Sequence, residues 1–482
     1  FRERFGDSVA VLHSALSEGE RFDEWQRIRF GQAKVVVGAR SAIFAPCERL
    51  KLIIIDEAHE SSYIAGSHPE YNAVEVAREL ARLHGGILVL GSATPSIEQY
   101  YNAQNGMYSI VKMNTRINGK ELPRVEVVDM ASELASGNKS LFSRKMFSAL
   151  ERTIDSGHQA ILFLNRRGHS TVVTCRSCGE TVKCPNCDIS MTYHISDVNS
   201  VGGANRLRCH YCGAEMPYPT HCPSCGSKYI KFMGAGTEKV EQECNKLFPG
   251  VPVLRMDNDT TRTKDAHYHI LSAFAEGKAK ILIGTQMIAK GLDFPKVSLV
   301  GIVSADTMLQ LPDYTSREKT YSLITQVAGR AGRAQTGGEV ILQTYTPKHY
   351  AIADAVNYKY DDFYTRELAM RKNGMYPPFS RMLRLIFSSE DQNEARSACY
   401  TFFLRLRDAV SAVAESRSTV LYLNMMTAPI GRIKGKFRFQ ILLKMKTDGC
   451  CEKLTDMFFD MYNTFDNAKV LLDAEINPTG LY

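Results

Sequence analysis

The sequence predicts an α/β protein with two parallel-sheet lobes, a cysteine-rich, two-metal insertion in the second lobe and a C-terminal α+β domain. Three observations predict this class. Two series of short apolar runs alternate with polar, helix-like stretches, eight of the 13 cysteines gather between residues 175 and 225, and the texture changes near residue 350. At 482 residues the chain also exceeds one hydrophobic core, since domains hold about 150 residues.

The first lobe is expected in residues 1–115, where four apolar runs are typical of short buried strands. These runs are residues 9–12, 34–37, 52–55 and 87–90. In open parallel sheets, ligands bind at the carboxyl ends of the strands. The segments that follow the last two runs are therefore candidates for a binding site.

Residues 56–59 read DEAH and directly follow the third run. At a strand end, Asp56 can reach a Mg²⁺ ion through water, and Glu57 can polarise the water that attacks a γ-phosphate. The alternative for an isolated acidic pair is a solvated turn. Residues 91–95 read GSATP and can hydrogen-bond to a nucleotide-site carboxylate; their alternative is a plain turn before a helix.

The same alternation returns after a Pro-bearing stretch and predicts a second lobe. Residues 116–174 hold a linker and the start of this lobe, and residues 227–348 continue it. Its expected strands are residues 160–164, 251–254, 280–283, 297–300 and 339–342. The cysteine-rich insertion occupies residues 175–226. Residues 349–482 are expected to form the C-terminal domain, with strand-like residues 382–387 and 437–445.

Two segments of the second lobe carry candidate nucleotide-binding residues. Residues 284–293 follow a strand and offer glycines and backbone donors; their alternative is an ordinary strand-to-helix connection. The second segment, residues 326–333, reads QVAGRAGR. In it, Arg330 and Arg333 lie three apart and so share one helix face. Two guanidiniums on one face can straddle a γ-phosphate and neutralise transition-state charge. A solvated charged face is the alternative for either arginine.

The clustered cysteines form four Cys-x-x-Cys pairs with zinc-knuckle spacing. They are Cys175 and Cys178, Cys184 and Cys187, Cys209 and Cys212, and Cys222 and Cys225. Eight thiolates supply two closed tetrahedral sites, which predicts two structural Zn²⁺ ions. Only five residues separate the first pair from the second, so we expect that adjacent pairs do not share an ion. We favour a nested arrangement, first pair with fourth and second with third, and a crossed arrangement is the alternative. Iron–sulfur ligation is the competing interpretation.

Charge and hydropathy bear on the partners. Without an apolar run of about 18 residues or a signal peptide, we expect no membrane partner and a cytoplasmic location. Residues 371–446 hold 14 Lys and Arg against 5 Asp and Glu, which suits a polyphosphate partner or else a solvated face. Basic residues there alternate with apolar ones, as on an exposed strand that grips phosphates or an edge strand protected from aggregation. They are Arg432, Lys434, Lys436 and Arg438.

Together, the four segments resemble, in order and spacing, the motifs of superfamily 2 helicases, motors that bind ATP between two RecA-like lobes. With the eight-cysteine insertion, the sequence resembles the primosomal protein N′ family of replication-restart helicases over essentially its whole length. Further segments that carry this resemblance are residues 12–14, 20–25, 40–46, 164–168, 236–238 and 376–379.

This resemblance implies 3′-to-5′ unwinding of DNA at abandoned forks, driven by ATP with Mg²⁺. The implied partners are forked and single-stranded DNA, other primosome proteins, single-stranded DNA-binding protein and the replicative helicase with its loader. It also places Arg40 near DNA, and the zinc module near DNA or partner proteins. Besides the catalytic acidic pair and the two arginines, the nucleotide contacts expected from the motifs are His59, Gly291, Asp293 and Gln326.

Three departures from the family pattern stand out. Ala58 replaces the usual Glu, which leaves the chemistry intact, and the loop around residues 70–74 lacks the family's basic character. No phosphate loop of the form Gly-x-x-x-x-Gly-Lys-Ser/Thr occurs. We therefore expect the chain to start just downstream of that loop, to lack the family's N-terminal DNA-binding domains and to hydrolyse ATP by itself at background rates. The alternatives are a DNA-binding primosome scaffold with a dispensable motor, and an RNA-directed relative.

Overall fold

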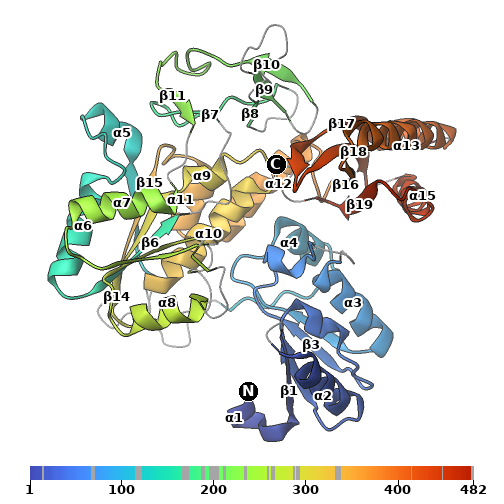
Figure 1. The fold of residues 1–482 in the computed structure, drawn as a ribbon, viewed down its shortest axis with the longest axis horizontal. Coiled ribbons are helices and arrows are strands. Elements are labelled where there is room, and N and C mark those ends of the chain that lie inside the picture. The colour runs from blue at the N-terminus through green and yellow to red at the C-terminus, as the bar shows by residue number, and fades with distance from the viewer. Residues whose placement is uncertain are drawn as a thin grey trace. The chain divides into compact units, whose positions relative to one another are not determined.

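The computed structural model of the chain divides into two compact units, residues 1–100 and 101–482 (Figure 1). The structure describes residues 1–13, 16–66, 71–113, 122–164, 173–185, 190–194, 206–209, 213–232, 236–257, 260–261, 266–285, 288, 294–331, 338–413, 415–447 and 449–478. Within those ranges, no helix combines the length and the apolar character that a bilayer crossing requires.

The first unit contains two pairs of parallel strands, and they are the four strands that the sequence predicts. β1 (Val9–Leu12) pairs with β2 (Val35–Gly38), and β3 (Leu52–Ile55) pairs with β4 (Ile87–Leu90). The helices of this part of the chain are α1 (Arg2–Phe5), α2 (Glu18–Arg29), α3 (Ala73–His84) and α4 (Ile97–Gln104).

The two faces of the β3–β4 pair differ in exposure. Ile55 of β3 packs with Val74 and Ala77 of α3 in a small core. The opposite face presents apolar side chains that are between 43% and 66% exposed, namely Leu52, Ile54, Ile87 and Val89. Because β-strands alternate their side chains, α3 covers only one face of this pair.

Local sequence signals set the helix ends. Ser17 and Glu20 form a capping box at the start of α2, in which each side chain accepts a hydrogen bond from the other residue's backbone N–H. At α3, the Asn72 side chain caps the first turn, and Gly85, with φ of 57°, ends the helix in the left-handed conformation that glycine tolerates best.

A six-stranded, all-parallel sheet forms the centre of the second unit, in the order β12-β13-β6-β14-β15-β5. In chain order, its strands are β5 (Val125–Asp129), β6 (Gln159–Leu164), β12 (Val253–Met256), β13 (Ile281–Gly284), β14 (Val297–Ser304) and β15 (Glu339–Thr344). Five of them are predicted from apolar runs. The sixth, β5, lies at the sheet edge and includes Glu126 and Asp129, so it lacks the continuous apolar run of a central parallel strand.

Helices cover both faces of this sheet (Figure 1). α6 (Arg144–Asp155) and α7 (Thr237–Leu247) share a core with the strands on one face, and α10 (Ser316–Ala331) packs against β14 on the other. The remaining helices of this lobe are α5 (Met130–Ala135), α8 (Ala266–Ala275) and α9 (Asp306–Leu309). Two helix-covered faces are the architecture predicted for a parallel-sheet lobe.

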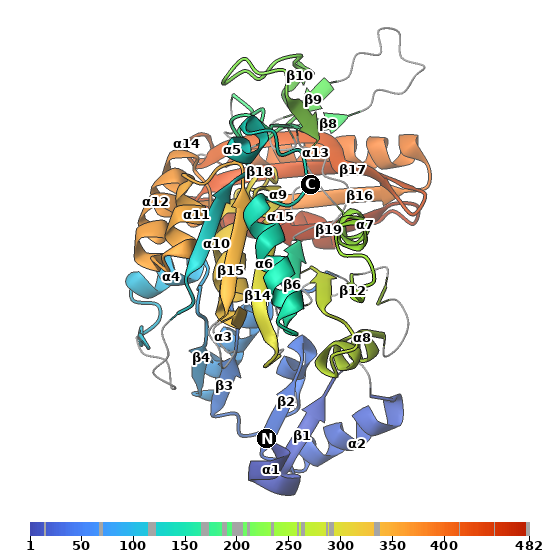
Figure 2. The ribbon, with the colours of Figure 1, turned by 90° about the vertical axis from the view of Figure 1, so that its left-hand side faces the viewer.

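The cysteine-rich insertion branches from this lobe between β6 and α7, as predicted. The chain leaves through β7 (Val173–Cys175) and returns through β11 (Ile230–Phe232), which pair antiparallel. Between them, β8 (Thr192–His194), β9 (Arg206–Arg208) and β10 (Glu215–Pro217) form a small antiparallel sheet (Figure 2). The apolar residues of the insertion share a core with Tyr314 and with Met382 and Leu442 of the C-terminal sheet.

An antiparallel sheet in the order β17-β18-β16-β19 forms the C-terminal part (Figure 2). Its strands are β16 (Ser380–Ser389), β17 (Val420–Ile433), β18 (Lys436–Lys446) and β19 (Leu471–Ile476). α13 (Gln392–Ala412) and α15 (Cys451–Asn463) pack on one face, and α14 (Ser416–Thr419) is a single turn before β17. α11 (Tyr350–Val356) and α12 (Tyr360–Asn373) precede the sheet. Strands at 382–387 and 437–445 are confirmed, but the separateness of this domain and the residue boundaries of all the domains stay predictions.

The interpretation of residues 432–438 as one exposed strand face is wrong. Arg432 is the penultimate residue of β17, and Lys434 and Gly435 form a turn with φ of 48° and 83°. Lys436 and Arg438 lie in the first three residues of β18. A two-residue turn with positive φ at both positions is the hairpin connection that matches strand twist, and glycine at its second position favours it. The basic residues therefore lie around a hairpin tip.

Candidate nucleotide and zinc sites

The acidic pair lies where the sequence predicts, directly after β3. Asp56 and Glu57 are both exposed, and the Glu57 backbone N–H donates to Asp56 Oδ1 at 2.9 Å. Glu57 has φ of 49°, a conformation that a residue with a side chain rarely adopts. Strained backbone of this kind is often found at functional sites, and here it follows from the sharp turn at the end of the strand.

A hydrogen bond joins the acidic segment to the GSATP loop after β4. His59 Nδ1 and Ser92 Oγ are 2.7 Å apart, and Ser92 Oγ also accepts from the Thr94 backbone N–H at 3.0 Å. The Ala58 N–H donates to the Gly91 carbonyl at 2.9 Å. Ser92 therefore bonds to the histidine of the DEAH segment, whereas the sequence predicted a bond to a carboxylate.

Ser92→Ala removes both hydrogen bonds of this hydroxyl, one of them to the nearly buried His59 side chain. We expect the unfolding free energy of the first unit to fall by about 1–3 kcal/mol, the usual cost of removing one partner of a buried hydrogen bond. Hydrogen exchange of the amides in residues 52–60 and 88–95 of the whole chain measures this. Ser61→Ala, at an exposed serine, is the matched control, and equal exchange in both variants would contradict the assigned role.

Arg40 and Tyr63 hold residues 62–64 next to the acidic pair. Arg40 Nη1 donates to the carbonyls of Ser62 and Ile64 at 3.1 and 2.6 Å, and its guanidinium lies 5.6 Å from the Tyr71 ring centre. The Tyr63 hydroxyl donates to the Asp56 carbonyl at 2.8 Å. Burial raises the pKa of Tyr63, and nearby carboxylates add to this. Sequence reasoning missed Tyr63, since nothing distinguishes it from a packed aromatic residue.

The second-lobe residues are only partly described. Gln326 lies half-buried on α10, which also contains the backbone of Arg330. Gly291, Asp293, Arg333 and the Arg330 side chain lie outside the described residues, so the shared helix face of the two arginines stays a prediction. Gly284, at the end of β13, is in close contact, since a Cβ there would lie 2.8 Å from the Met256 carbonyl oxygen and closer still to Ile288.

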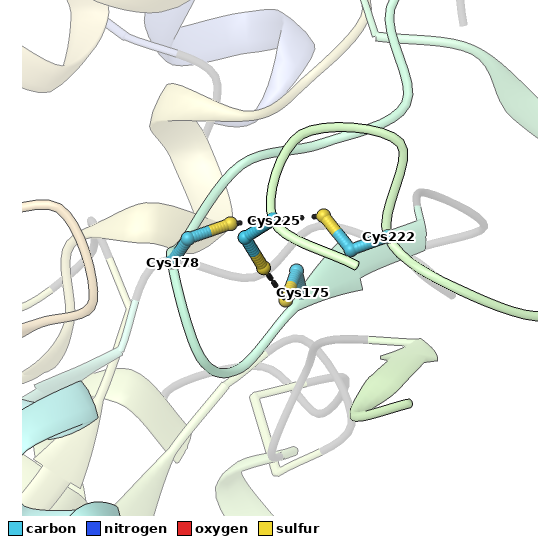
Figure 3. A group of neighbouring side chains, drawn as sticks. All are labelled: Cys175, Cys178, Cys222 and Cys225. Carbon is cyan, nitrogen blue, oxygen red and sulfur yellow. Dashed lines mark hydrogen bonds between the residues drawn. The ribbon is translucent and has the colours of Figure 1, made fainter. Parts of the chain in front are cut away.

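Four cysteine sulfurs from the first and fourth pairs lie within 4.8 Å of one another (Figure 3). Cys175 Sγ lies 3.6 Å from Cys225 Sγ, and Cys178 Sγ lies 3.7 Å from Cys222 Sγ. A tetrahedral Zn²⁺ with Zn–S distances of about 2.3 Å sets its sulfurs about 3.8 Å apart. The donor set therefore fits a closed Cys₄ zinc site, with first and fourth pairs joined as in the nested arrangement.

Backbone turns position these sulfurs. In the first and fourth pairs, the first cysteine's N–H donates to the carbonyl five residues later, and its carbonyl accepts from the glycine four residues later. Those glycines, Gly179 and Gly226, have φ of 76° and 70°. The same two bonds recur from Cys209 to Ala214 and Gly213, the latter with φ of 72°. A glycine directly after the second cysteine is the sequence signal for this turn, and our sequence analysis did not use it.

The second expected site is described only in part. Cys184 and Cys209, one from each inner pair, are buried in a common core. Cys187 and Cys212 lie outside the described residues, so the second site stays a prediction. At the first site, burial raises the pKa of the Cys175 thiol. Hydrogen bonds from the backbone N–H groups of Cys178 and Ser177 and from the Cys225 and Cys178 side chains together outweigh burial and bring this pKa to about 7. A thiol with such a pKa is readily available as a thiolate ligand.

The chain matches three protein families along its length. Residues 227–335 match the helicase conserved C-terminal domain, residues 184–217 match the PriA DNA helicase Cys-rich region domain, and residues 372–478 match the primosomal protein N C-terminal domain. A parallel-sheet lobe of helicase type that carries a zinc-binding cysteine-rich region defines the class of protein.

The relatives make the identification narrower. Replication restart protein PriA of Bacillus subtilis is 47% identical over 99% of this chain and 58% of its own length, and that of Treponema pallidum is 38% identical over 99% of this chain and 70% of its own. The chain belongs to the PriA replication restart protein family. It spans between about half and two thirds of the length of most of these relatives. Among solved structures, RecG bound to a three-way DNA junction covers 78% of this chain and 37% of its own length, with 14% identity and a TM-score of 0.39.

Proposed function

We propose that the chain is the motor and zinc-bearing part of an ATP-dependent helicase that unwinds DNA in the 3′-to-5′ direction at abandoned replication forks and starts primosome assembly. The observation that carries the proposal is the hydrogen-bonded link between the DEAH segment and the GSATP loop through His59 and Ser92. In a motor, such a link couples the nucleotide site to a second segment that responds to the bound strand. Membership of the PriA family supports DNA as that strand.

Bound ATP with Mg²⁺ supplies the phosphoryl-transfer chemistry. We assign Asp56 to holding the metal through water and Glu57 to polarising the attacking water, because both exposed carboxylates follow a parallel strand. Arg330 and Arg333 are assigned to the developing charge on the γ-phosphate, and His59, Gln326, Gly291 and Asp293 to further nucleotide contacts. Arg40, which holds the loop next to Asp56, is assigned to the DNA side of this coupling.

The proposed partners are forked and single-stranded DNA, other primosome proteins, single-stranded DNA-binding protein and the replicative helicase with its loader. The zinc module and the C-terminal domain are the surfaces assigned to them. Zinc in this role is structural, because a Cys₄ site leaves no coordination position open.

Glu57→Gln tests the motor. In a protein extended to the full length of these relatives, we expect DNA-stimulated ATP hydrolysis to fall about 10²- to 10⁴-fold, the usual contribution of a general base. Strand displacement from a duplex with a 3′ single-stranded tail is expected to fall equally, with fork affinity unchanged. Glu48→Gln, at an exposed carboxylate, is the control. Unwinding that persists in Glu57→Gln would favour a DNA-binding scaffold over a motor.

A further inference from the structure

The tip of the β17–β18 hairpin, residues 428–438, combines exposed apolar and basic side chains. Ile430 and Ile433 are 50% and 39% exposed, whereas Ile441 and Leu443 farther along β18 are fully buried. Isolated exposed apolar residues are ordinary on a protein surface. Ile430 and Ile433 lie within four residues at the turn end of the hairpin, among cations, and so form a distinct surface.

The backbone holds Ile430 out of the strand pairing. Thr427 pairs with Phe439 and Arg432 pairs with Phe437, so four residues of β17 stand opposite one residue of β18. Ile430 lies in this bulge, and its carbonyl oxygen accepts from Arg438 Nη1 at 3.5 Å. Bulges of this kind redirect side chains at sheet edges and sites.

One cation is fixed in place at the tip. The Arg432 guanidinium lies 4.7 Å from the Phe437 ring centre, and its Nε donates to the Gly435 carbonyl at 3.4 Å. With the turn at Lys434 and Gly435, these contacts organise the tip before any ligand binds. A preorganised surface loses less entropy on binding than a flexible one.

All the charged side chains of this hairpin are positive. Residues 416–447 contain no Asp or Glu. The cations on the hairpin are Arg432, Lys434, Lys436, Arg438, Lys444 and Lys446. Such a surface is complementary to a polyanion, and apolar side chains among cations are the means by which proteins open a base step while binding the flanking phosphates.

We propose that the hairpin tip is a wedge for the end of a DNA duplex. Ile430 and Ile433 contact the terminal base pair at the branch of a fork, and Arg432, Lys434 and Lys436 bind the phosphates of the strands that diverge there. The inference rests on the proposed DNA function and specifies which DNA feature the C-terminal sheet recognises.

The test uses the 482-residue chain without nucleotide and forked DNA with 2-aminopurine at the branch, whose fluorescence rises when the base unstacks. The unaltered chain is expected to raise this fluorescence. The double variant Ile430→Ala/Ile433→Ala is expected to lose at least two thirds of the rise and to bind the fork within about twofold of the original affinity, since phosphate contacts dominate affinity. Leu421→Ala, at a β17 residue 38% exposed and away from the tip, is the matched control and should keep the full rise.

The cations are tested by salt dependence. Lys434→Ala/Lys436→Ala is expected to weaken fork binding and to reduce the slope of log affinity against log salt by about 1–2, because each phosphate contact contributes about 0.9 on duplex DNA. A circular dichroism melt that is unchanged in both double variants shows that the fold is retained.

The outcomes separate this inference from the function on which it rests. A full fluorescence rise in the isoleucine double variant, with normal affinity, overturns the wedge and leaves DNA binding intact. An equal rise with the probe in the middle of the duplex also overturns it. Failure of the unaltered chain to bind forked DNA removes the proposed function itself. Displacement of the fork by polyglutamate at equal charge concentration would assign the tip to an acidic protein and overturn the wedge.

Discussion

Replacing Cys222 by serine is expected to lower the zinc content of the chain from two ions to one and to unfold the base of the cysteine-rich insertion. Cys222 is a buried member of the four-sulfur cluster, and a hydroxyl is a poor replacement for a thiolate at a closed zinc site. Structural zinc contributes on the order of 10 kcal/mol to the folding of small domains. Loss of the ion therefore removes most of what holds the two outer cysteine turns together.

Metal analysis of the purified chain and hydrogen exchange of residues 173–185 and 213–232 measure this effect. Cys47→Ser, at a half-buried cysteine outside the insertion, is the control and should retain two zinc ions. Two ions in Cys222→Ser, or a single ion in the unaltered chain, would contradict the assignment. Iron with visible absorption in place of zinc would favour the iron–sulfur interpretation.

Arg371→Met is expected to destabilise the second unit by about 3–5 kcal/mol, the usual cost of removing one partner of a buried ion pair. The Arg371 side chain is 2% exposed, forms ion pairs with Glu367 and Glu318, and donates to the Pro377 carbonyl at 3.2 Å. Its guanidinium also lies 5.2 Å from the Tyr314 ring centre. The substitution removes this cation from the buried Glu367 of α12 and from the partly exposed Glu318 of α10.

The pH dependence of this variant follows from Glu318. Burial raises the pKa of this carboxyl, and Arg371 opposes the rise. A carboxyl with a raised folded-state pKa stabilises the fold fully below its unfolded pKa and loses that contribution as the pH rises through the folded pKa. Without Arg371 the folded pKa rises further, so the loss of unfolding free energy relative to the unaltered chain should be larger at neutral pH than at acidic pH.

Urea denaturation at acidic and neutral pH measures this difference. Lys372→Ala changes an exposed cation at the next position of α12 and should alter the unfolding free energy by no more than about 0.5 kcal/mol at either pH. A deficit in Arg371→Met that does not depend on pH would show that lost packing around Tyr314, and not the carboxylates, sets the cost.

The parts of the fold that the sequence predicted are those with strong local signals. Ile281 to Ile283 are apolar on both strand faces, as a buried parallel strand requires, and they were placed correctly. Ile53 to Ile55 have the same apolar pattern and were also placed correctly, although the Ile54 face is exposed. β17 was missed because Asn424, Pro429 and Gly431 interrupt its pattern. The pattern of residues 432–438 was misread, because alternation along one strand and alternation across a hairpin turn look alike until the turn at Gly435 is recognised.

The candidate sites divide in the same way. Cysteine spacing argued only against adjacent pairs sharing an ion, because five residues separate Cys178 from Cys184. The choice of the nested over the crossed arrangement depends on the structure, which brings the sulfurs of the first and fourth pairs together. The contact of Ser92 with His59 depends on two strand ends that meet in the sheet, and the position of Tyr63 depends on how its loop folds back. Such contacts are set by three-dimensional packing, which no local pattern specifies.

The insertion leaves the second lobe through β7 and returns through β11, and the two strands pair side by side. The points where the chain enters and leaves the insertion are therefore neighbours. None of the strands of the six-stranded sheet belongs to the insertion. Shortening, lengthening or exchanging this branch requires no rethreading of the lobe. A change in the insertion is therefore compatible with an unchanged strand order in the second lobe.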